Sequence, residues 1–185
     1  MDNGASSYRR FIDGDKSAFE ELVDLYREPL IFFIYRYTEN VEAAEELAED
    51  VFVELIIHPE RYDFRASLKT YIFSIGRNKA VDYLRKRSRL TLVGEENLEE
   101  IADLKTLEDH VIRGEENRQL SRALGIIKEE YRTALHLVYI EELSYDEAGK
   151  IMKKSRKQVE NLVYRGKKAV KAILEKEGFN FEDKR

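Results

Sequence analysis

Apolar side chains recur along the chain at spacings of three and four residues, which is the pattern of amphipathic helices. The first such stretch covers residues 17–37, the second residues 44–55 and the third residues 68–84. Ser67 stands directly before the third stretch, where a serine can cap the N-terminus of a helix. These stretches predict three helices that pack together as one lobe.

Shorter helical stretches follow in the second half of the chain. Residues 115–127 and 129–140 predict two helices, and Ser144 and Ser155 are candidate N-caps for two more. The last helix is apolar on one face and polar or basic on the other. Two helices joined by a turn of three or four residues are typical of a helix-turn-helix. No segment has the periodicity of a strand, so we predict an all-α fold.

The two helical groups are separated by an acidic segment with weak periodicity. Residues 91–116 carry 2 Lys or Arg against 9 Asp or Glu, and they include Gly94. We therefore predict three parts. The first helical lobe spans residues 1–90, the acidic linker residues 91–116, and the second lobe, with the helix-turn-helix, residues 117–185.

The formal net charge of −5 hides a division of charge along the chain. Residues 41–60 hold acidic side chains but neither Lys nor Arg. Residues 77–89 carry six basic side chains against Asp82 alone, and residues 150–171 carry nine against Glu160 alone. One run of this kind is often only a solvated helix face. Two basic runs on separate helical units favour contact with nucleic-acid phosphates.

The composition argues against several other functions. The 185 residues include no Cys, which removes disulfides and thiolate metal sites, and the three His residues lack acidic partners at ligand spacing. We therefore expect no metal, no cofactor and no enzymatic activity. No apolar run approaches the ~20 residues of a membrane span, and the N-terminus lacks a secretory pattern. We expect a cytoplasmic protein without membrane insertion.

The ordered series of helical segments resembles the small bacterial sigma factors of the extracytoplasmic-function (ECF) group, which contain only regions two and four of the sigma-70 family. The segments that resemble region two are AFEELVDLYREPL, AAEELAEDVFVELI and ASLKTYIFSIGRNKAVDYLRKRSR. The segment that resembles region four is IIKEEYRTALHLVYIEELSYDEAGKIMKKSRKQVENLVYRGKKAV. This resemblance implies a protein that binds core RNA polymerase, recognises the −10 and −35 promoter elements and assists promoter melting.

The resemblance assigns the acidic helix of the first lobe to the polymerase. In relatives this helix docks on the clamp helices of the largest polymerase subunit. The matching candidates are Glu49, Asp50, Val53, Glu54 and Ile57. An acidic face with apolar side chains to bury suits a basic partner surface. A helix that is merely solvated is the alternative interpretation.

The resemblance assigns residues 61–89 to the −10 element. Melting requires a base to leave the stack, and a loop can hold that base by stacking and by hydrogen bonds to its edge. The loop candidates are Tyr62, Asp63, Phe64, Arg65 and Ser67. The candidates for contacts with the strand and its phosphates are Lys69, Tyr71, Arg77, Asn78, Arg85 and Lys86. Phe64 and Tyr71 are equally compatible with a place in the core.

The resemblance assigns the last helix to the major groove of the −35 element, where Arg and Lys recognise guanine and Asn and Gln recognise adenine. The candidates are Arg156, Lys157, Gln158, Glu160, Asn161, Tyr164, Arg165 and Lys168. Relatives usually have Gly in the turn where Lys153 stands. A non-Gly residue in a left-handed turn costs on the order of 1 kcal/mol, which leaves the shape of this turn open.

The implied partners are core RNA polymerase, promoter DNA and an anti-sigma factor. The acidic linker would either lie in the polymerase channel or serve as a tether. Two other interpretations compete with a sigma factor. A stand-alone helix-turn-helix regulator would bind duplex DNA as a dimer with a defined half-site spacing. A protein that only sequesters a partner would bind polymerase without opening a promoter.

Overall fold

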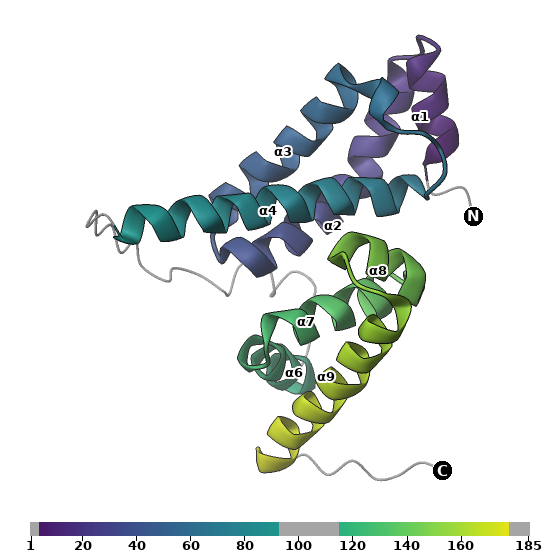
Figure 1. Cartoon of the computed structure of the whole chain (residues 1–185). Coiled ribbons are helices and arrows are strands. Elements are labelled where there is room, and N and C mark those ends of the chain that lie inside the picture. The colour runs from purple at the N-terminus through teal and green to yellow at the C-terminus, as the bar shows by residue number, and fades with distance from the viewer. Residues whose placement is uncertain (1–3, 93–114, 178–185) are drawn as a thin grey trace. The chain divides into compact units, whose positions relative to one another are not determined.

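The computed structural model describes residues 4–92 and 115–177, and every regular element in these two ranges is a helix. The chain divides into two compact units, one built on α1 to α4 and the other on α6 to α9 (Figure 1). The prediction of an all-α fold is confirmed. The predicted linker falls mainly outside the described residues, since residues 91–92 end α4 and residues 115–116 begin α6.

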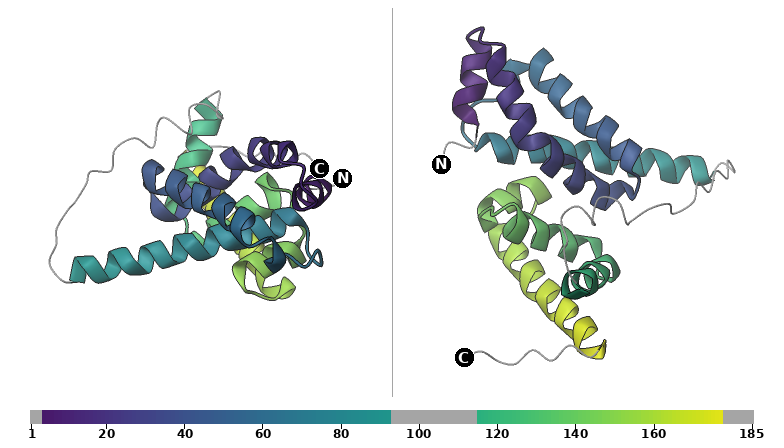
Figure 2. Two further views of the ribbon diagram at one scale, coloured as in Figure 1. Left: turned by 90° about the horizontal axis from the view of Figure 1, so that it is seen from above. Right: turned by 180° about the vertical axis from the view of Figure 1, so that it is seen from behind.

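The first unit is organised around its second helix, α2. Its elements are α1 (Ala5–Ile12), α2 (Ser17–Thr38), α3 (Val41–Ile57), the 3-10 turn η1 (Pro59–Arg61) and α4 (Leu68–Leu92). Helix α2 packs against α1, α3 and α4, and α3 also packs against α4. The helices predicted at residues 17–37, 44–55 and 68–84 are confirmed as α2, α3 and α4. Figure 2 shows the same helices from two further directions.

Side-chain caps set where two of these helices begin. The Asn40 side chain accepts a hydrogen bond from the backbone N–H of Ala43 at 2.7 Å and caps α3. The Ser67 hydroxyl accepts one from the N–H of Thr70 at 3.2 Å, so the serine cap predicted for α4 is confirmed. Helix α4 then runs past the predicted end, through the exposed residues 85–89, which have no apolar stripe that could have revealed it.

The core of the first unit is apolar and closely packed. Phe33 of α2 and Phe73 of α4 are fully buried, and their ring centroids lie 5.0 Å apart. Gly76 allows α4 to approach α2 here, because a Cβ at this position would lie 2.8 Å from Leu30 Cδ1. The packing holds α4 against α2 along the shared apolar faces, while the polar face of α4 remains at the surface.

Helix α1 was not predicted from the sequence. Tyr8 on this helix is fully buried, and its hydroxyl donates a hydrogen bond to the carbonyl oxygen of Leu55 at 2.8 Å. Burial raises the pKa of Tyr8 to about 12, so the phenol remains a donor at neutral pH. The hydrogen bond fastens α1 to the C-terminal part of α3, close to the loop that joins α3 to α4.

The second unit contains α6 (Glu115–Ile126), α7 (Glu129–Leu135), the π-helical turn η2 (His136–Ile140), α8 (Tyr145–Met152) and α9 (Arg156–Lys176). The helix predicted at residues 129–140 therefore changes its hydrogen-bond pattern half-way. Helices α6 and α7 both pack on α9. Gly166 brings α9 close to α7, because a Cβ there would lie 3.0 Å from Leu135 Cδ1.

None of the helices in the described ranges combines the length and the apolar character that crossing a membrane requires.

Candidate polymerase and nucleic-acid interfaces

One face of α3 combines exposed apolar and acidic side chains. Val53 is 48% exposed and Ile57 is 61% exposed, and Glu49 is also exposed. These residues are four positions apart, so they follow one stripe of the helix. Ile56, which was not predicted, adds a further apolar side chain that is 48% exposed. An unburied apolar patch beside carboxylates is suited to a protein partner rather than to the acidic backbone of DNA.

The carboxylate of Glu54 is engaged within the unit. Arg61 Nη1 lies 3.0 Å from Glu54 Oε1, and Lys79 Nζ lies 3.4 Å from Glu54 Oε2. Lys79 also lies 3.7 Å from Asp50 Oδ2. Glu54 thus links α3 to η1 and α4. Glu49, by contrast, has no ion-pair partner among the residues that the structure describes. Of the three predicted carboxylates, Glu49 is therefore the most available to a partner.

The loop between η1 and α4 presents an aromatic ring to solvent. Phe64 is 36% exposed and has a φ of 60°, a left-handed conformation that non-glycine residues adopt at a cost. Asp63 stabilises this turn, because its Oδ1 accepts a hydrogen bond from the Arg65 N–H at 3.0 Å. Asp63, Phe64 and Arg65 are all exposed. Three of the predicted loop residues are therefore accessible to a ligand.

The remaining loop aromatic supports the loop from below. Tyr62 is only 5% exposed, and its hydroxyl donates to the carbonyl oxygen of Ala66 at 2.7 Å. Its ring lies 4.5 Å from that of Phe64 and 5.1 Å from that of Tyr71, between ring centroids. Tyr71 is half-buried, and desolvation raises its pKa. In this conformation Tyr62 and Tyr71 form a platform under the loop, and Phe64 is the ring that reaches solvent.

The candidate contacts of α4 are spread along the whole helix. Lys69 and Arg77 are half-buried, whereas Asn78, Arg85 and Lys86 are exposed. A rise of 1.5 Å per residue places Lys69 and Arg85 about 24 Å apart, which is a span of several nucleotides. The C-terminal end of α4 extends past the other helices of its unit (Figures 1 and 2). The geometry suits a strand that follows α4 from the loop to this basic end.

Helix α9 begins with a capping box. The Ser155 hydroxyl accepts from the Gln158 N–H at 3.3 Å, and the Gln158 side-chain oxygen accepts from the Ser155 N–H at 2.8 Å. Gln158 is therefore occupied at the helix start. Arg156 also has a partner, since its Nη1 lies 3.2 Å from Asp146 Oδ2. In this structure Gln158 and Arg156, both predicted to read bases, instead stabilise the start of α9.

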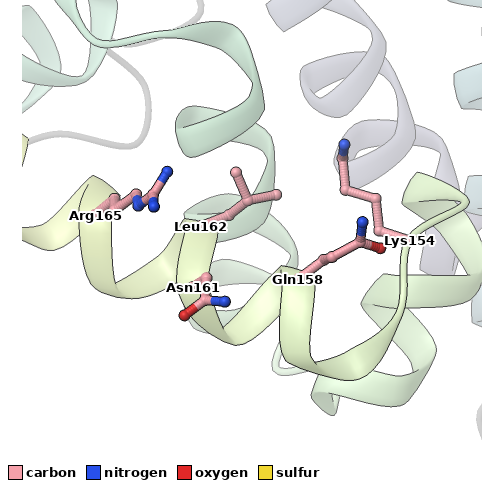
Figure 3. A pocket seen from close by; sticks show the side chains of 5 residues that line it. All are labelled: Lys154, Gln158, Asn161, Leu162 and Arg165. Atoms are coloured by element: carbon pink, nitrogen blue, oxygen red, sulfur yellow. The ribbon is translucent and has the colours of Figure 1, made fainter.

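Other candidates on α9 remain available. Lys157, Asn161 and Arg165 are exposed and have no side-chain partner among the described residues. Figure 3 shows Gln158, Asn161 and Arg165 in sequence along α9, where they help to line a shallow hollow. The last three candidates, Glu160, Tyr164 and Lys168, are also exposed. The Lys168 ammonium lies 5.0 Å from the centroid of the Tyr164 ring.

The turn between α8 and α9 contains a non-glycine residue, Lys153, in a left-handed backbone conformation. Lys153 has a φ of 55°, a conformation that non-glycine residues adopt at a cost. The Lys154 N–H donates to the Gly149 carbonyl oxygen at 2.9 Å, and a Cβ on Gly149 would lie 2.6 Å from the Lys154 carbonyl oxygen. The close approach at Gly149 and the bent backbone at Lys153 together form the turn.

A buried pair of titratable side chains lies at the π-helical turn of the second unit. His136 Nε2 lies 3.1 Å from Glu141 Oε1, and the two side chains are 1% and 5% exposed. His136 is the first residue of the π-helical turn that leads from α7 towards α8, and Glu141 directly follows the last one. Burying two such groups is costly unless each compensates the other. Within residues 4–92 and 115–177, no three His, Asp or Glu residues are grouped as a metal ion would require.

Two family models match the chain, Sigma-70 region 2 over residues 22–90 and Sigma-70 region 4 over residues 117–170. The chain is 28% identical to the ECF RNA polymerase sigma factor SigW of Bacillus subtilis (strain 168) over 170 residues, which cover 87% of this chain and 91% of SigW. It is 26% identical to SigM of the same organism over 163 residues, covering 88% and 98% of the two chains. The chain belongs to the ECF group of sigma factors.

Solved structures agree with this sigma factor in fold. The sigma factor RpoE, crystallised with the anti-sigma factor NepR from Bartonella quintana, has a TM-score of 0.67 and 19% identity, covering 85% of this chain and 96% of RpoE. CnrH, solved in complex with the cytosolic domain of CnrY, has a TM-score of 0.63 and 20% identity, covering 94% and 95%.

As a sigma factor, the protein is a transcription initiation factor and not an enzyme. It acts by binding core RNA polymerase and recognising promoter elements. A stand-alone regulator is not favoured, because the first unit matches region 2 and the second matches region 4. The region 2 match begins at residue 22, so α1 and the first turn of α2 precede it.

The sequence analysis did not predict several residues that the structure of this sigma factor brings to attention. Ile56 was missed although it stands beside Ile57 in the acidic helix. Arg9 was missed because α1 was not predicted, and its guanidinium lies 4.7 Å from the centroid of the Phe64 ring. His136 and Glu141 were missed because a π-helical turn places them together, and helical spacing gives no signal for that pairing.

Proposed function

We propose that this sigma factor uses three separate surfaces. Helix α3 docks on the clamp helices of the largest subunit of core RNA polymerase. The loop before α4, together with α4 itself, holds the opened strand of the −10 element. The N-terminal half of α9 reads the −35 element in the major groove. The exposed Phe64 ring, at one end of a basic helix, is the observation that carries the proposal.

The polymerase contact rests on the exposed stripe of α3. Val53, Ile56 and Ile57 would bury their apolar surface against the partner, and the energy of such interfaces concentrates in a few buried side chains. Glu49 would steer the approach to a basic partner surface. We propose that Glu54 and Asp50 act mainly through Lys79, by fixing α3 against α4.

The −10 contact rests on Phe64 and the basic face of α4. An extruded base would stack on Phe64, while Asp63 and Arg65 flank the ring and offer an acceptor and a donor to the base edge. The buried ring of Tyr62 would hold Phe64 in place and would not itself contact the DNA. The phosphates would follow α4 towards Arg85 and Lys86.

The −35 contact rests on the exposed face of α9. We propose that Asn161 and Arg165 approach base edges, for which their amide and guanidinium groups suit adenine and guanine, and that Lys157 contacts a phosphate. Glu160 can accept a hydrogen bond from cytosine N4. Gln158 would contribute by holding the helix start through its capping box.

We also propose an anti-sigma factor as a partner and the cytoplasm as the compartment. The structural neighbour RpoE was crystallised with an anti-sigma factor, and CnrH was solved with a cytosolic domain of CnrY. The exposed apolar residues of α3 would be suited to such a partner as well as to polymerase, so the two would compete for this helix.

Replacing Phe64 tests the −10 assignment. We expect Phe64→Ala to weaken promoter opening by the assembled holoenzyme about 5-fold or more, because loss of one aromatic platform costs about 1–3 kcal/mol per stacked base. The measurement is the fluorescence of 2-aminopurine in the −10 region of DNA selected by the wild-type holoenzyme. Phe64→Trp is the matched control and should retain opening. Normal opening by the Phe64→Ala holoenzyme would contradict the assignment.

A further inference from the structure

Helix α1 places an arginine directly on the exposed ring of the −10 loop. Arg9 Cζ lies 4.7 Å from the centroid of the Phe64 ring, although the two residues belong to elements far apart in the sequence. The guanidinium group stacks well on aromatic rings and keeps its in-plane N–H donors available while it does so. The same side chain can therefore contact Phe64 and a further group at once.

Two adjacent arginines of α1 differ sharply in their surroundings. Arg10 is held by carboxylates, with Nη2 2.6 Å from Asp15 Oδ2 and Nη1 3.0 Å from Glu21 Oε1. Hydrogen bonds to Asp15 and Glu21 raise the pKa of Arg10. Arg9 is exposed, and no carboxylate among the described residues pairs with it. Of the two cations, Arg9 is the one left available for an anionic ligand.

The position of Arg9 is fixed by the residue before it. Tyr8 is fully buried, with its hydroxyl bonded to Leu55 and its ring centroid 5.7 Å from that of Tyr62. Tyr62 in turn packs against Phe64 at 4.5 Å. One connected group of side chains therefore holds both α1 and the loop. Because this group is packed before any ligand arrives, little ordering of Arg9 is required on binding.

We propose that Arg9 is a nucleic-acid contact of the −10 site. Its guanidinium stacks on Phe64 and donates hydrogen bonds to the phosphate of the nucleotide whose base is held by the loop. The single-stranded DNA surface thereby extends onto α1, a helix that precedes the region 2 match. The inference rests on the proposed function, since it requires that Phe64 is the platform for the extruded base.

The test measures the binding of assembled holoenzyme to a fork-junction DNA whose −10 strand is unpaired. The DNA is selected from a random library with the wild-type holoenzyme. We expect Arg9→Ala to weaken binding about 10-fold. We also expect the negative slope of log affinity against log salt to become shallower by about one, as loss of one phosphate contact does. Arg9→Lys should keep the salt slope and lose only part of the affinity, because the charge remains and the planar stacking is lost.

Arg10→Ala is the matched control, because it removes the same charge from the neighbouring position. It should change the affinity for DNA less than twofold, because the Arg10 guanidinium is already paired with Asp15 and Glu21 and its loss removes no proposed DNA contact. Unchanged binding by Arg9→Ala overturns the inference. Tighter binding by Arg9→Ala also overturns it, because the guanidinium would then only cover the ring. If Phe64→Ala weakens binding and Arg9→Ala does not, only this inference fails; if neither weakens binding, the −10 assignment fails as well.

Discussion

Replacing Val53 and Ile57 together by lysine is expected to weaken the binding of core RNA polymerase about 30-fold or more. Both side chains are exposed on α3, at 48% and 61%, so the fold does not depend on them. In the complex they would be buried, and full burial of a Val or Ile side chain contributes about 1.5–3 kcal/mol. The added ammonium groups would also meet a basic partner surface and replace attraction by repulsion.

The measurement is a titration of labelled protein with core RNA polymerase at moderate salt. Leu25→Lys is a suitable control, because Leu25 is also an exposed apolar residue, at 50%, but lies on α2. The control should bind within a few-fold of the unchanged protein. Helical content and thermal unfolding should match in all three proteins. Wild-type affinity in the doubly substituted protein would remove α3 from the polymerase interface.

Charge reversal of Asp50 or Glu54 would test the same interface less clearly. Both carboxylates contact Lys79, and Glu54 also contacts Arg61, so their reversal would disturb the packing of α3 on α4. A loss of binding could then come from the fold rather than from the contact. Glu49 avoids this difficulty, because no described residue forms an ion pair with it.

Among the substitutions considered, removing one member of the buried His136–Glu141 pair is expected to lower stability most. Glu141→Ala should lower the free energy of unfolding of this unit by about 3 kcal/mol, because the two buried side chains lie 3.1 Å apart and removing one member of a buried pair costs about 3–5 kcal/mol. The unit that carries α9 would then open more often, and −35 recognition would weaken with it. The first unit should keep its stability.

Hydrogen exchange of the full-length chain, followed by mass spectrometry, measures the two units separately. Peptides from α7 and α9 should exchange faster in Glu141→Ala, and peptides from α2 and α4 should not change. Glu142→Ala is the matched control, since Glu142 is adjacent, exposed and subject to the same substitution. It should change stability by less than about 0.5 kcal/mol. Equal protection in both variants would show that the buried pair contributes nothing.

Local patterns predicted the helices that carry the longest apolar stripes. The stripes of α2, α3 and α4 repeat over many turns, and Ser67 and Ser155 precede α4 and α9 as caps. The capping role of Gln158 could also have been read from the sequence, because a serine followed three residues later by Gln is the pattern of a capping box. Assigning Gln158 only to base contact overlooked that signal.

Contacts between distant residues decided what the sequence could not predict. Helix α1 has eight residues, too few to form a stable helix alone, and it depends on a hydrogen bond from Tyr8 to Leu55, 47 positions away. The exposure of Phe64 also depends on tertiary structure, because Tyr62 occupies the buried position beside it. By polarity alone the phenol of Tyr62 would be expected at the surface and the ring of Phe64 in the core, so no local rule identifies the platform and its support.

Strand opening by core RNA polymerase, with and without this protein, tests the central claim most directly. The measurement uses the full-length chain, core polymerase and duplex DNA selected by their mixture, with permanganate reactivity of thymines in the −10 region as the readout. We predict reactivity only when protein and polymerase are both present. Protection of duplex DNA by the protein alone, as a dimer, would contradict the account, and so would polymerase binding without strand opening.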